Sequence, residues 1–234
     1  MNIFDSTIIT FVNGFSRTSW ALDQTINLFA HTGLFKGGVL TIAVWWAWFR
    51  KEHEAENRRI IIATLVASVL VLFIARALAL GLPFRPRPAL NPELVFQLPY
   101  GVSATNLGSW SSFPSDHAAL FFALATGLFF ISRILGVLIA VHLLLIVVLA
   151  RIYLGLHYPT DLLAGAILGI VITWVAIQSN IFVYFTKLGR HLYDNKPALF
   201  YPLFFFFTYQ IATMFIDLRD LASSAFKYSK ILIG

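Results

Sequence analysis

The sequence has no cysteine and few charged residues. Without cysteine the chain can form neither disulfides nor thiolate metal sites. Charged residues make up 12% of the 234 positions, about half of the share typical of a soluble domain. Hydrophobic residues make up 59%, including 23 Phe and 6 Trp, which is more apolar surface than one water-soluble core could bury. We therefore expect an all-α protein, a polytopic membrane bundle. The N-terminus lacks a basic segment, an apolar stretch and a small-residue cleavage site in sequence, so we expect no cleaved signal peptide.

Apolar runs predict about six membrane spans, since each span needs ~20 residues. The runs cover residues 35–49, 60–82, 115–132, 134–156, 159–180 and 198–217. Residues 3–15 and 20–33 are also apolar but are interrupted by polar side chains, and we interpret residues 1–34 as interfacial or re-entrant helices. Alternatively, residues 20–50 form one long tilted span. We expect a single domain over residues 1–234, with 198–217 as an additional C-terminal span.

The basic residues indicate how the chain is oriented. The net charge of +6 could suggest nucleic acid, but the basic residues flank apolar spans, which favours topology and anionic lipid contact, with no nucleic acid partner. Three connections on one predicted side carry eight of the 17 basic residues: Arg50, Lys51, Arg58, Arg59, Arg133, Lys187, Arg190 and Lys196. That side should be the cytoplasm. The tail carries three more cations, Arg219, Lys227 and Lys230, and six spans with an outward start would place them outside, against this rule. Either the last run is re-entrant or the span count is off by one.

Loop 83–113 lies on the opposite predicted side, and it begins with LPFRPRP (82–88). Two prolines keep this stretch extended, so it cannot continue the preceding span. The guanidinium groups of Arg85 and Arg87 are planar forks that suit phosphate oxygens. Alternatively, they are two snorkelling arginines at the end of a span.

The segment SSFPSDHAALFFALATG (111–127) opens a helix. Pro114 and Ser115 fit the first turn, where free backbone N–H groups and the helix dipole attract an anion. His117 lies in the same turn, facing whatever those groups bind. The alternative is an ordinary polar cap with an interfacial histidine, although capping does not require His117.

The segment ARIYLGLHYPTDLLAG (150–165) joins the end of one predicted span to the start of the next. Arg151 ends the first span, and Pro159 begins the second. His157 lies in the turn between them, and Asp161, four residues later, could accept the imidazole N–H and so fix the tautomer. Alternatively, the His–Asp pair only locks the turn. Ionisable groups at a membrane boundary are costly and favour a function.

Together the three segments resemble the signature of the type 2 phosphatidic acid phosphatase superfamily, which includes vanadium haloperoxidases. That signature reads Lys-x6-Arg-Pro, Pro-Ser-Gly-His and Ser-Arg-x5-His-x3-Asp. Here Arg87-Pro88, the run from Pro114 to His117, and Arg151, His157 and Asp161 match it. The resemblance covers about residues 60–180 and implies a haloperoxidase-like catalytic core there. LPFRPRP with FPSDH and HYPTD is also similar to bacterial undecaprenyl diphosphate phosphatases.

Three positions depart from the signature. Its lysine would fall at Leu80, so another cation must replace it. We favour Arg85, the neighbour of the motif, over Arg76 within the span. Asp116 replaces glycine and either points away or tunes His117. Ala150 replaces serine and removes a hydroxyl donor.

The resemblance implies a phosphohistidine mechanism. His157 is the expected nucleophile, Asp161 its orienting partner and His117 the general acid. The phosphate oxygens are expected to contact Arg87, Arg151 and Ser115, with Arg85, Arg76 and Asp116 close by. We expect no metal and no cofactor.

A lipid phosphate or diphosphate in the bilayer is the expected substrate, with undecaprenyl diphosphate favoured. The expected location is the plasma (inner) membrane, with the site facing the periplasm or exterior. Phosphatidic acid or phosphatidylglycerol phosphate would fit nearly as well, and so would a phosphotransferase reaction. A transporter is the alternative from another class, although transport sites usually lie near the bilayer midplane. A haem or metal carrier with ligands His117 and His157 ranks last, because the neighbouring arginines favour an anion.

Overall fold

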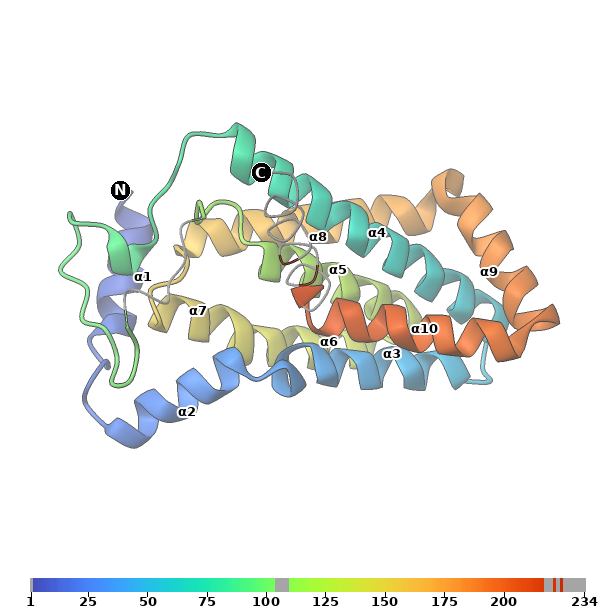
Figure 1. Ribbon diagram of the computed structural model, residues 1–234, viewed down its shortest axis with the longest axis horizontal. Helices are drawn as coiled ribbons and strands as arrows, with labels where there is room; N and C mark the ends of the chain where they lie inside the picture. The colour runs from blue at the N-terminus through green and yellow to red at the C-terminus, as the bar shows by residue number, and fades with distance from the viewer. Residues whose placement is uncertain (1, 104–109, 217–220, 222–223, 225–234) are drawn as a thin grey trace.

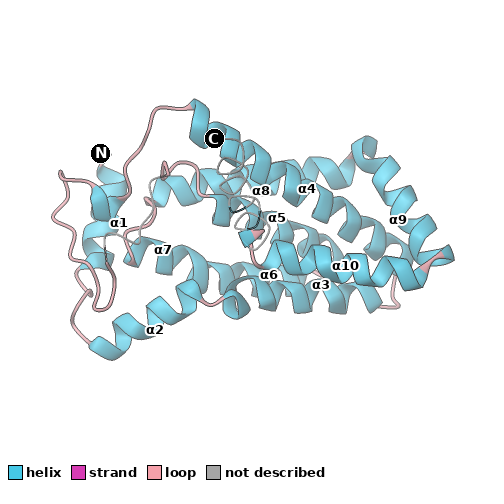
Figure 2. Ribbon diagram, in the orientation of Figure 1, coloured by secondary structure: helices cyan, strands magenta, loops and turns pink. Residues whose placement is uncertain are grey.

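The structure, a computed structural model, describes residues 2–103 and 110–216 together with 221 and 224. Every regular element in these residues is a helix, which confirms the all-α prediction (Figure 2). The α-helices are α1 (Ile3–Asn13), α2 (Trp20–His31), α3 (Val39–Phe49), α4 (Glu54–Gly81), α5 (Asp116–Ile131), α6 (Arg133–Leu143), α7 (Ala150–Tyr153), α8 (Pro159–Gln178), α9 (Val183–Asn195) and α10 (Pro197–Ala212). Short 3-10 or π turns are η1 (Leu34–Gly38), η2 (Pro88–Leu90), η4 (Leu144–Leu149) and η5 (Asn180–Phe182). The tail cations Arg219, Lys227 and Lys230 lie outside the described residues.

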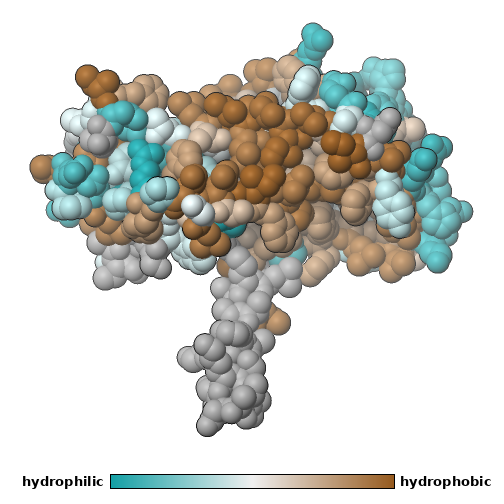
Figure 3. All heavy atoms as spheres, turned by 90° about the horizontal axis from the view of Figure 1, so that it is seen from above, coloured by the Kyte–Doolittle hydropathy of each residue, from teal (hydrophilic) through white to brown (hydrophobic). Residues whose placement is uncertain are grey.

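Three helical stretches are long and apolar enough to cross a membrane: α4, residues 133–153 from α6 to α7, and α8. The pair formed by α2 and Leu34–Phe49 would add a fourth span, but it bends by 62° at its break. The six expected spans are therefore not confirmed. Helices α5 and α10 have 16 residues each, or about 24 Å at 1.5 Å per residue, against a hydrocarbon core of ~30 Å. An apolar belt nevertheless covers the middle of the molecule between two hydrophilic ends (Figure 3).

Helix α5 lies at the centre of the bundle, where it packs most extensively against α8 and α4. Two glycines of α8 make this packing possible. A Cβ on Gly165 would lie 2.3 Å from the carbonyl oxygen of Ser115, and one on Gly169 would lie 2.2 Å from that of Ala119. Small residues let helix backbones approach closely in a membrane protein. This contact brings the N-termini of α5 and α8 together, and with them two of the three motifs.

The ends of the bundle differ in character (Figure 1). At one end Arg50 donates to the carbonyl of Ile131 at 3.3 Å, and Arg59 donates to that of Ile177 at 3.2 Å. These cations satisfy carbonyls at the C-termini of α5 and α8, and α9 lies at the same end. Helix α1 and the described part of loop 83–113 lie at the other end.

Helix α10 packs along α3 through aromatic side chains. Trp48 is fully buried, and its ring stacks on Phe200 at 5.1 Å between centroids. The indole N–H of Trp45 donates to the hydroxyl of Thr208 at 3.1 Å. Farther along, Gly37 allows the backbone of Ala212 to approach, because a Cβ there would lie 2.1 Å from the Ala212 carbonyl oxygen. The C-terminal end of α10 is thereby fixed beside η1.

Candidate active site

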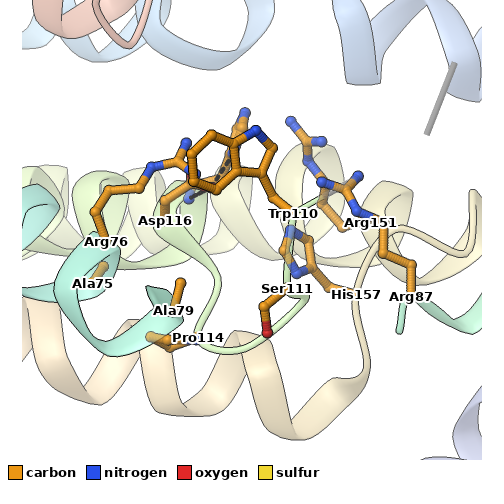
Figure 4. A pocket seen from close by; sticks show the side chains of 11 residues that line it. Ala75, Arg76, Ala79, Arg87, Trp110, Ser111, Pro114, Asp116, Arg151 and His157 are labelled. Atoms are coloured by element: carbon orange, nitrogen blue, oxygen red, sulfur yellow. Dashed lines mark hydrogen bonds and ion pairs between the residues drawn. The ribbon is translucent and has the colours of Figure 1, made fainter. Parts of the chain in front are cut away.

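A cavity of about 570 Å³ opens where the three motif segments meet, and Figure 4 shows its wall. The lining residues are Ala75, Arg76, Ala79, Arg87, Trp110, Ser111, Pro114, Asp116, His117, Arg151 and His157. They come from α4, the loop that follows it, the start of α5 and the α7–α8 region. Six of the nine predicted site residues therefore line one pocket, and the other three, Arg85, Ser115 and Asp161, lie behind its wall.

His157 lies in the turn between α7 and α8, and its side chain is buried. Gly155 makes this turn with φ of +66°, a conformation that favours glycine. The ring Nδ1 lies 2.8 Å from the main-chain carbonyl oxygen of Ser112. A carbonyl oxygen can only accept, so Nδ1 carries the proton and Nε2 of the neutral ring keeps its lone pair. His157 is thus held as a tautomer that can act as a nucleophile.

The contact of Asp161 differs from the expected one. Its Oδ2 lies 3.8 Å from Nδ1 of His157, too far for a hydrogen bond. The same oxygen accepts from the backbone N–H of Tyr158 at 2.8 Å and closes the first turn of α8. Because α8 starts at Pro159, this carboxylate is drawn into capping, and the carbonyl of Ser112 takes the imidazole N–H instead. The buried charge of Asp161 remains close enough to stabilise a cationic ring.

His117 lies in the first turn of α5, as predicted, and its partner is the residue beside it. Nδ1 of His117 lies 2.8 Å from Oδ1 of Asp116, and Oδ2 of Asp116 lies 2.6 Å from Nη2 of Arg76. Asp116, which stands where the signature has glycine, therefore contacts the His117 ring and does not point away. It links the proposed acid to a cation on α4.

Two arginines of the pocket have no ion-pair partner among the residues that the structure describes. Arg151 is buried and Arg87 is half-buried, and no carboxylate of a described residue lies within 4.0 Å of either. The Nε of Arg87 is also buried without a hydrogen-bond acceptor. Burial lowers the pKa of the Arg87 guanidinium from its usual value, but arginine stays protonated in proteins. Arg151, which is buried, and Arg87, which is half-buried, have no ion-pair partner among the described residues, and together beside His157 they form a site for an anion.

Arg85, the favoured substitute for the missing lysine, is engaged elsewhere. It forms ion pairs with Asp5 at 2.7 Å and with Asp161, and it donates to the hydroxyl of Thr160 at 2.9 Å. Its guanidinium also lies over the ring of Tyr158, at 3.9 Å from the centroid. Two buried carboxylates hold this cation outside the pocket wall. The structure therefore favours Arg76, not Arg85, as the third cation of the pocket.

Ser115 lies at the start of a helix, as predicted, but it does not line the pocket. It is fully buried at the N-cap of α5, where its Oγ accepts from the N–H of Ala118 at 3.4 Å. Its own N–H donates to the carbonyl of Asp161 at 3.1 Å. The close approach of α8 at Gly165 covers this residue from one side. Ser115 thus joins the two motif helices, and a direct contact of its hydroxyl with phosphate stays a prediction.

Two lining residues, Trp110 and Ser111, were missed by the sequence analysis. The Trp110 ring is half-exposed and stacks with the guanidinium of Arg76 at 5.2 Å. Ser111 Oγ accepts from the N–H of Arg85 at 3.2 Å, and Ser112 donates its N–H to the carbonyl of Arg85 at 2.9 Å. These contacts join the backbone of residue 85 to the Ser111 side chain and to the backbone of residue 112, and neither belongs to a motif of the sequence.

The described residues contain no group of three His, Cys, Asp or Glu side chains that could share a metal ion. Independence from metal stays a prediction.

The geometry agrees with the comparison of the chain with known families. The sequence model described as "PAP2 superfamily" matches residues 60–184, more than half of the chain. The chain belongs to the PAP2 superfamily. This confirms the resemblance that the three motifs carry, and it supports the expected class of enzyme, a hydrolase that acts on phosphate esters.

Three curated proteins are similar to this chain at low identity. The Bacillus subtilis undecaprenyl-diphosphatase BcrC is 23% identical over 184 residues, which cover 78% of this chain and 88% of that protein. The bacitracin transport permease protein BcrC of Bacillus licheniformis is 29% identical over 147 residues, 63% of each chain. The putative undecaprenyl-diphosphatase YbjG of Escherichia coli is 25% identical over 149 residues, which cover 61% of this chain and 69% of that protein.

Among solved structures, LpxE of Aquifex aeolicus matches with a TM-score of 0.52 and 27% identity. The match covers 76% of this chain and all of that one. It confirms the expected fold of the catalytic core.

Proposed function

We propose that this protein is a membrane phosphatase that hydrolyses a lipid diphosphate to the lipid monophosphate. Undecaprenyl diphosphate is the substrate that we infer, because two similar proteins are named for that reaction. One observation carries the proposal: the nucleophilic nitrogen of His157 is free on the wall of a pocket that also holds two unpaired arginines. Buried cations are stable only beside counter-charge. A phosphate group supplies that charge and suits the planar forks of Arg87 and Arg151.

The first step transfers the terminal phosphoryl group to the enzyme. Nε2 of His157 attacks the terminal phosphorus, so an N–P bond forms as the bridging P–O bond breaks. His117 gives a proton to the leaving oxygen and thereby releases the lipid monophosphate. Asp116 supports this role, because its carboxylate lies 2.8 Å from the other ring nitrogen of His117 and stabilises the charged ring. Arg87 and Arg151 stabilise the equatorial oxygens.

The second step regenerates the free enzyme. Water attacks the phosphohistidine phosphorus while neutral His117 takes its proton, so the N–P bond breaks and inorganic phosphate leaves. The ring of His157 keeps its proton on Nδ1 throughout, because the carbonyl of Ser112 accepts it. The charge that develops on this ring during the reaction is stabilised by Asp161, whose Oδ2 lies 3.8 Å away.

The distribution of charge supports a pocket on the outer face of the plasma membrane. The end of the bundle away from the pocket carries the basic residues that the sequence analysis assigned to the cytoplasm, among them Arg50 and Arg59. Positive residues gather on the cytoplasmic side of membrane proteins. The pocket then meets the outer leaflet, where a diphosphate carrier lipid would be dephosphorylated.

The test is phosphate release by the purified protein in detergent. Undecaprenyl diphosphate, phosphatidic acid and phosphatidylglycerol phosphate are compared in parallel, with His157→Ala as the inactive control. We expect the highest kcat/KM with undecaprenyl diphosphate. When the reaction with ³²P-labelled substrate is quenched, we also expect ³²P bound to the wild-type enzyme in an acid-labile form. Absence of phosphate release from all three lipids would contradict the proposal and favour a transporter. A labelled product formed on addition of a lipid alcohol would identify a phosphotransferase.

A further inference from the structure

A second cavity, of about 390 Å³, adjoins the phosphate pocket. The two cavities share Arg76 and Asp116 on their walls. The rest of the second wall is apolar and consists of Val69, Leu72, Phe73, Met214 and Phe215. We call this cavity the α4–α10 groove. Its position beside the Arg76–Asp116 pair means that a molecule with phosphate in the first pocket would place its next atoms here.

One wall of the groove is a stripe along α4. Val69, Leu72, Phe73 and Arg76 are spaced i, i+3, i+4 and i+7, which places them on one face of a helix. The stripe runs for about 10 Å, since an α-helix rises 1.5 Å per residue. It leads from the charged pair toward the middle of α4. The Phe73 side chain is 70% exposed, so the groove opens on the outer surface of the bundle, where hydrocarbon would surround it.

The opposite wall lies just beyond the end of α10. Met214 and Phe215 have φ of 55° and 57°, a region that bulky side chains rarely occupy. Such a conformation persists only where the surroundings fix it. Here the N–H of Phe215 donates to the carbonyl of Gln210 at 2.7 Å, and Gly37 admits the backbone of Ala212. The turn directs two large apolar side chains at the α4 stripe.

We propose that the α4–α10 groove binds the hydrocarbon next to the phosphate of the lipid substrate. Met214 and Phe215 then determine which tails the enzyme accepts. This inference rests on the proposed function. Met214 and Phe215 lie outside the matched family region, which ends at residue 184, whereas the α4 wall of the groove lies inside it.

The chemistry of the groove favours a lipid tail over other occupants. A polar headgroup would lose hydrogen bonds with water and gain none from five apolar side chains. An amphiphile satisfies both cavities at once: its phosphate neutralises the pocket, and its first carbons cover the stripe. The Arg76–Asp116 pair marks the boundary between the charged and apolar halves of such a molecule.

Filling the groove from the α4 side tests this proposal. Val69→Trp adds bulk at the deep end of the stripe, away from the phosphate pocket. Its kcat/KM is measured with undecaprenyl diphosphate and with the short isoprenoid isopentenyl diphosphate, and the ratio of the two values is compared with that of the wild type. We expect the ratio to fall by about tenfold or more, the discrimination that apolar pockets commonly supply. Leu70→Trp is the matched control, because Leu70 is the next residue of α4 and does not line the groove; it should leave the ratio unchanged.

Filling the groove from the other side provides a second, independent variant. Phe215→Trp should lower the same ratio, whereas Phe206→Trp, at an exposed position of α10 outside the groove, should not. An unchanged ratio in folded Val69→Trp or folded Phe215→Trp would overturn the proposal. A wild-type enzyme that hydrolyses neither diphosphate would overturn the proposed function instead, so the two failures are distinguishable.

Discussion

Nδ1 of His157 lies 2.8 Å from the carbonyl oxygen of Ser112, and this contact fixes the state of the nucleophile. The partner is a main-chain atom, so no single side-chain substitution removes it. Asp161 lies farther from the same nitrogen, at 3.8 Å. The Ser112 carbonyl therefore orients the His157 ring, and the Asp161 carboxylate stabilises the charge that develops on it.

This division predicts that Asp161→Asn is less harmful than in enzymes where a carboxylate alone sets the tautomer. In those enzymes the same change costs ~10⁴-fold in kcat. Because the carbonyl of Ser112 still holds the ring here, we expect a loss of about 10–100-fold, which corresponds to about 1.4–2.8 kcal/mol of transition-state stabilisation. Steady-state kinetics on undecaprenyl diphosphate, with His157→Ala as the reference for complete loss, measures this. A loss as large as that of His157→Ala, in a folded variant, would contradict the division.

Arg76 and Arg85 should differ in what their removal damages. Arg76 lines the phosphate pocket, whereas Arg85 bridges the buried carboxylates of Asp5 and Asp161. We expect Arg76→Ala to lower kcat/KM by about 10–100-fold with little change in the melting temperature. Arg85→Ala should destabilise the protein by about 3 kcal/mol, because it leaves buried charges uncompensated.

Thermal unfolding in detergent and kinetics on the same preparations separate the two effects. Arg85→Lys is the informative control, since it keeps the charge but loses the fork that reaches both carboxylates. It should recover only part of the stability. If Arg85→Ala unfolds as the wild type does and Arg76→Ala keeps full activity, Arg85 and not Arg76 is the cation that replaces lysine.

The long apolar helices could be predicted from the sequence, whereas for the short helices the sequence did not show whether they cross the membrane. Helices α4 and α8 agree with the predicted runs because hydrophobicity alone decides them. The predicted run 115–132 is also a helix, α5, but its 16 residues do not reach across the ~30 Å hydrocarbon core. Whether such a helix crosses depends on the loops around its ends, and composition does not report that.

The candidate site shows the same limit at the level of single residues. Motif spacing predicted that His117, Arg151 and His157 meet, and all three line one pocket. Their catalytic roles stay predictions. Motif spacing did not predict the ion pair of Arg85 with Asp5, because Asp5 is 80 residues away in the sequence. The contact of His157 with the carbonyl of Ser112 could not be predicted from the sequence, because every residue has a main-chain carbonyl. Ion pairs between residues far apart in the sequence, and hydrogen bonds to main-chain acceptors, are found only from the three-dimensional structure.

Removal of divalent metal should leave the reaction intact. The mechanism assigns charge stabilisation to Arg87 and Arg151, and arginines can fill this role without a metal ion. Incubation with EDTA, followed by dialysis and assay, should change kcat/KM by less than about twofold, well below the 1.4 kcal/mol that a tenfold loss represents. Vanadate, which resembles phosphate, should instead inhibit by competing with the substrate, and its affinity should fall in Arg151→Ala. Loss of activity with EDTA and its recovery on adding Mg²⁺ would contradict this assignment.

The contact between α5 and α8 should be sensitive to a single branched side chain. A Cβ on Gly165 would lie 2.3 Å from the Ser115 carbonyl oxygen, so Gly165→Val must push the two helices apart. That separation would shift the first turn of α5, which bears His117, away from the turn that bears His157. We expect losses of both stability and activity, with a destabilisation of about 1–3 kcal/mol as for other overpacked cores. Gly81→Ala is the matched control: a Cβ there meets nothing within 4 Å, and the change should be neutral or stabilise α4 by about 0.5–1 kcal/mol. If Gly165→Val kept the melting temperature and kcat/KM of the wild type, this close approach would not be what brings the two histidines together.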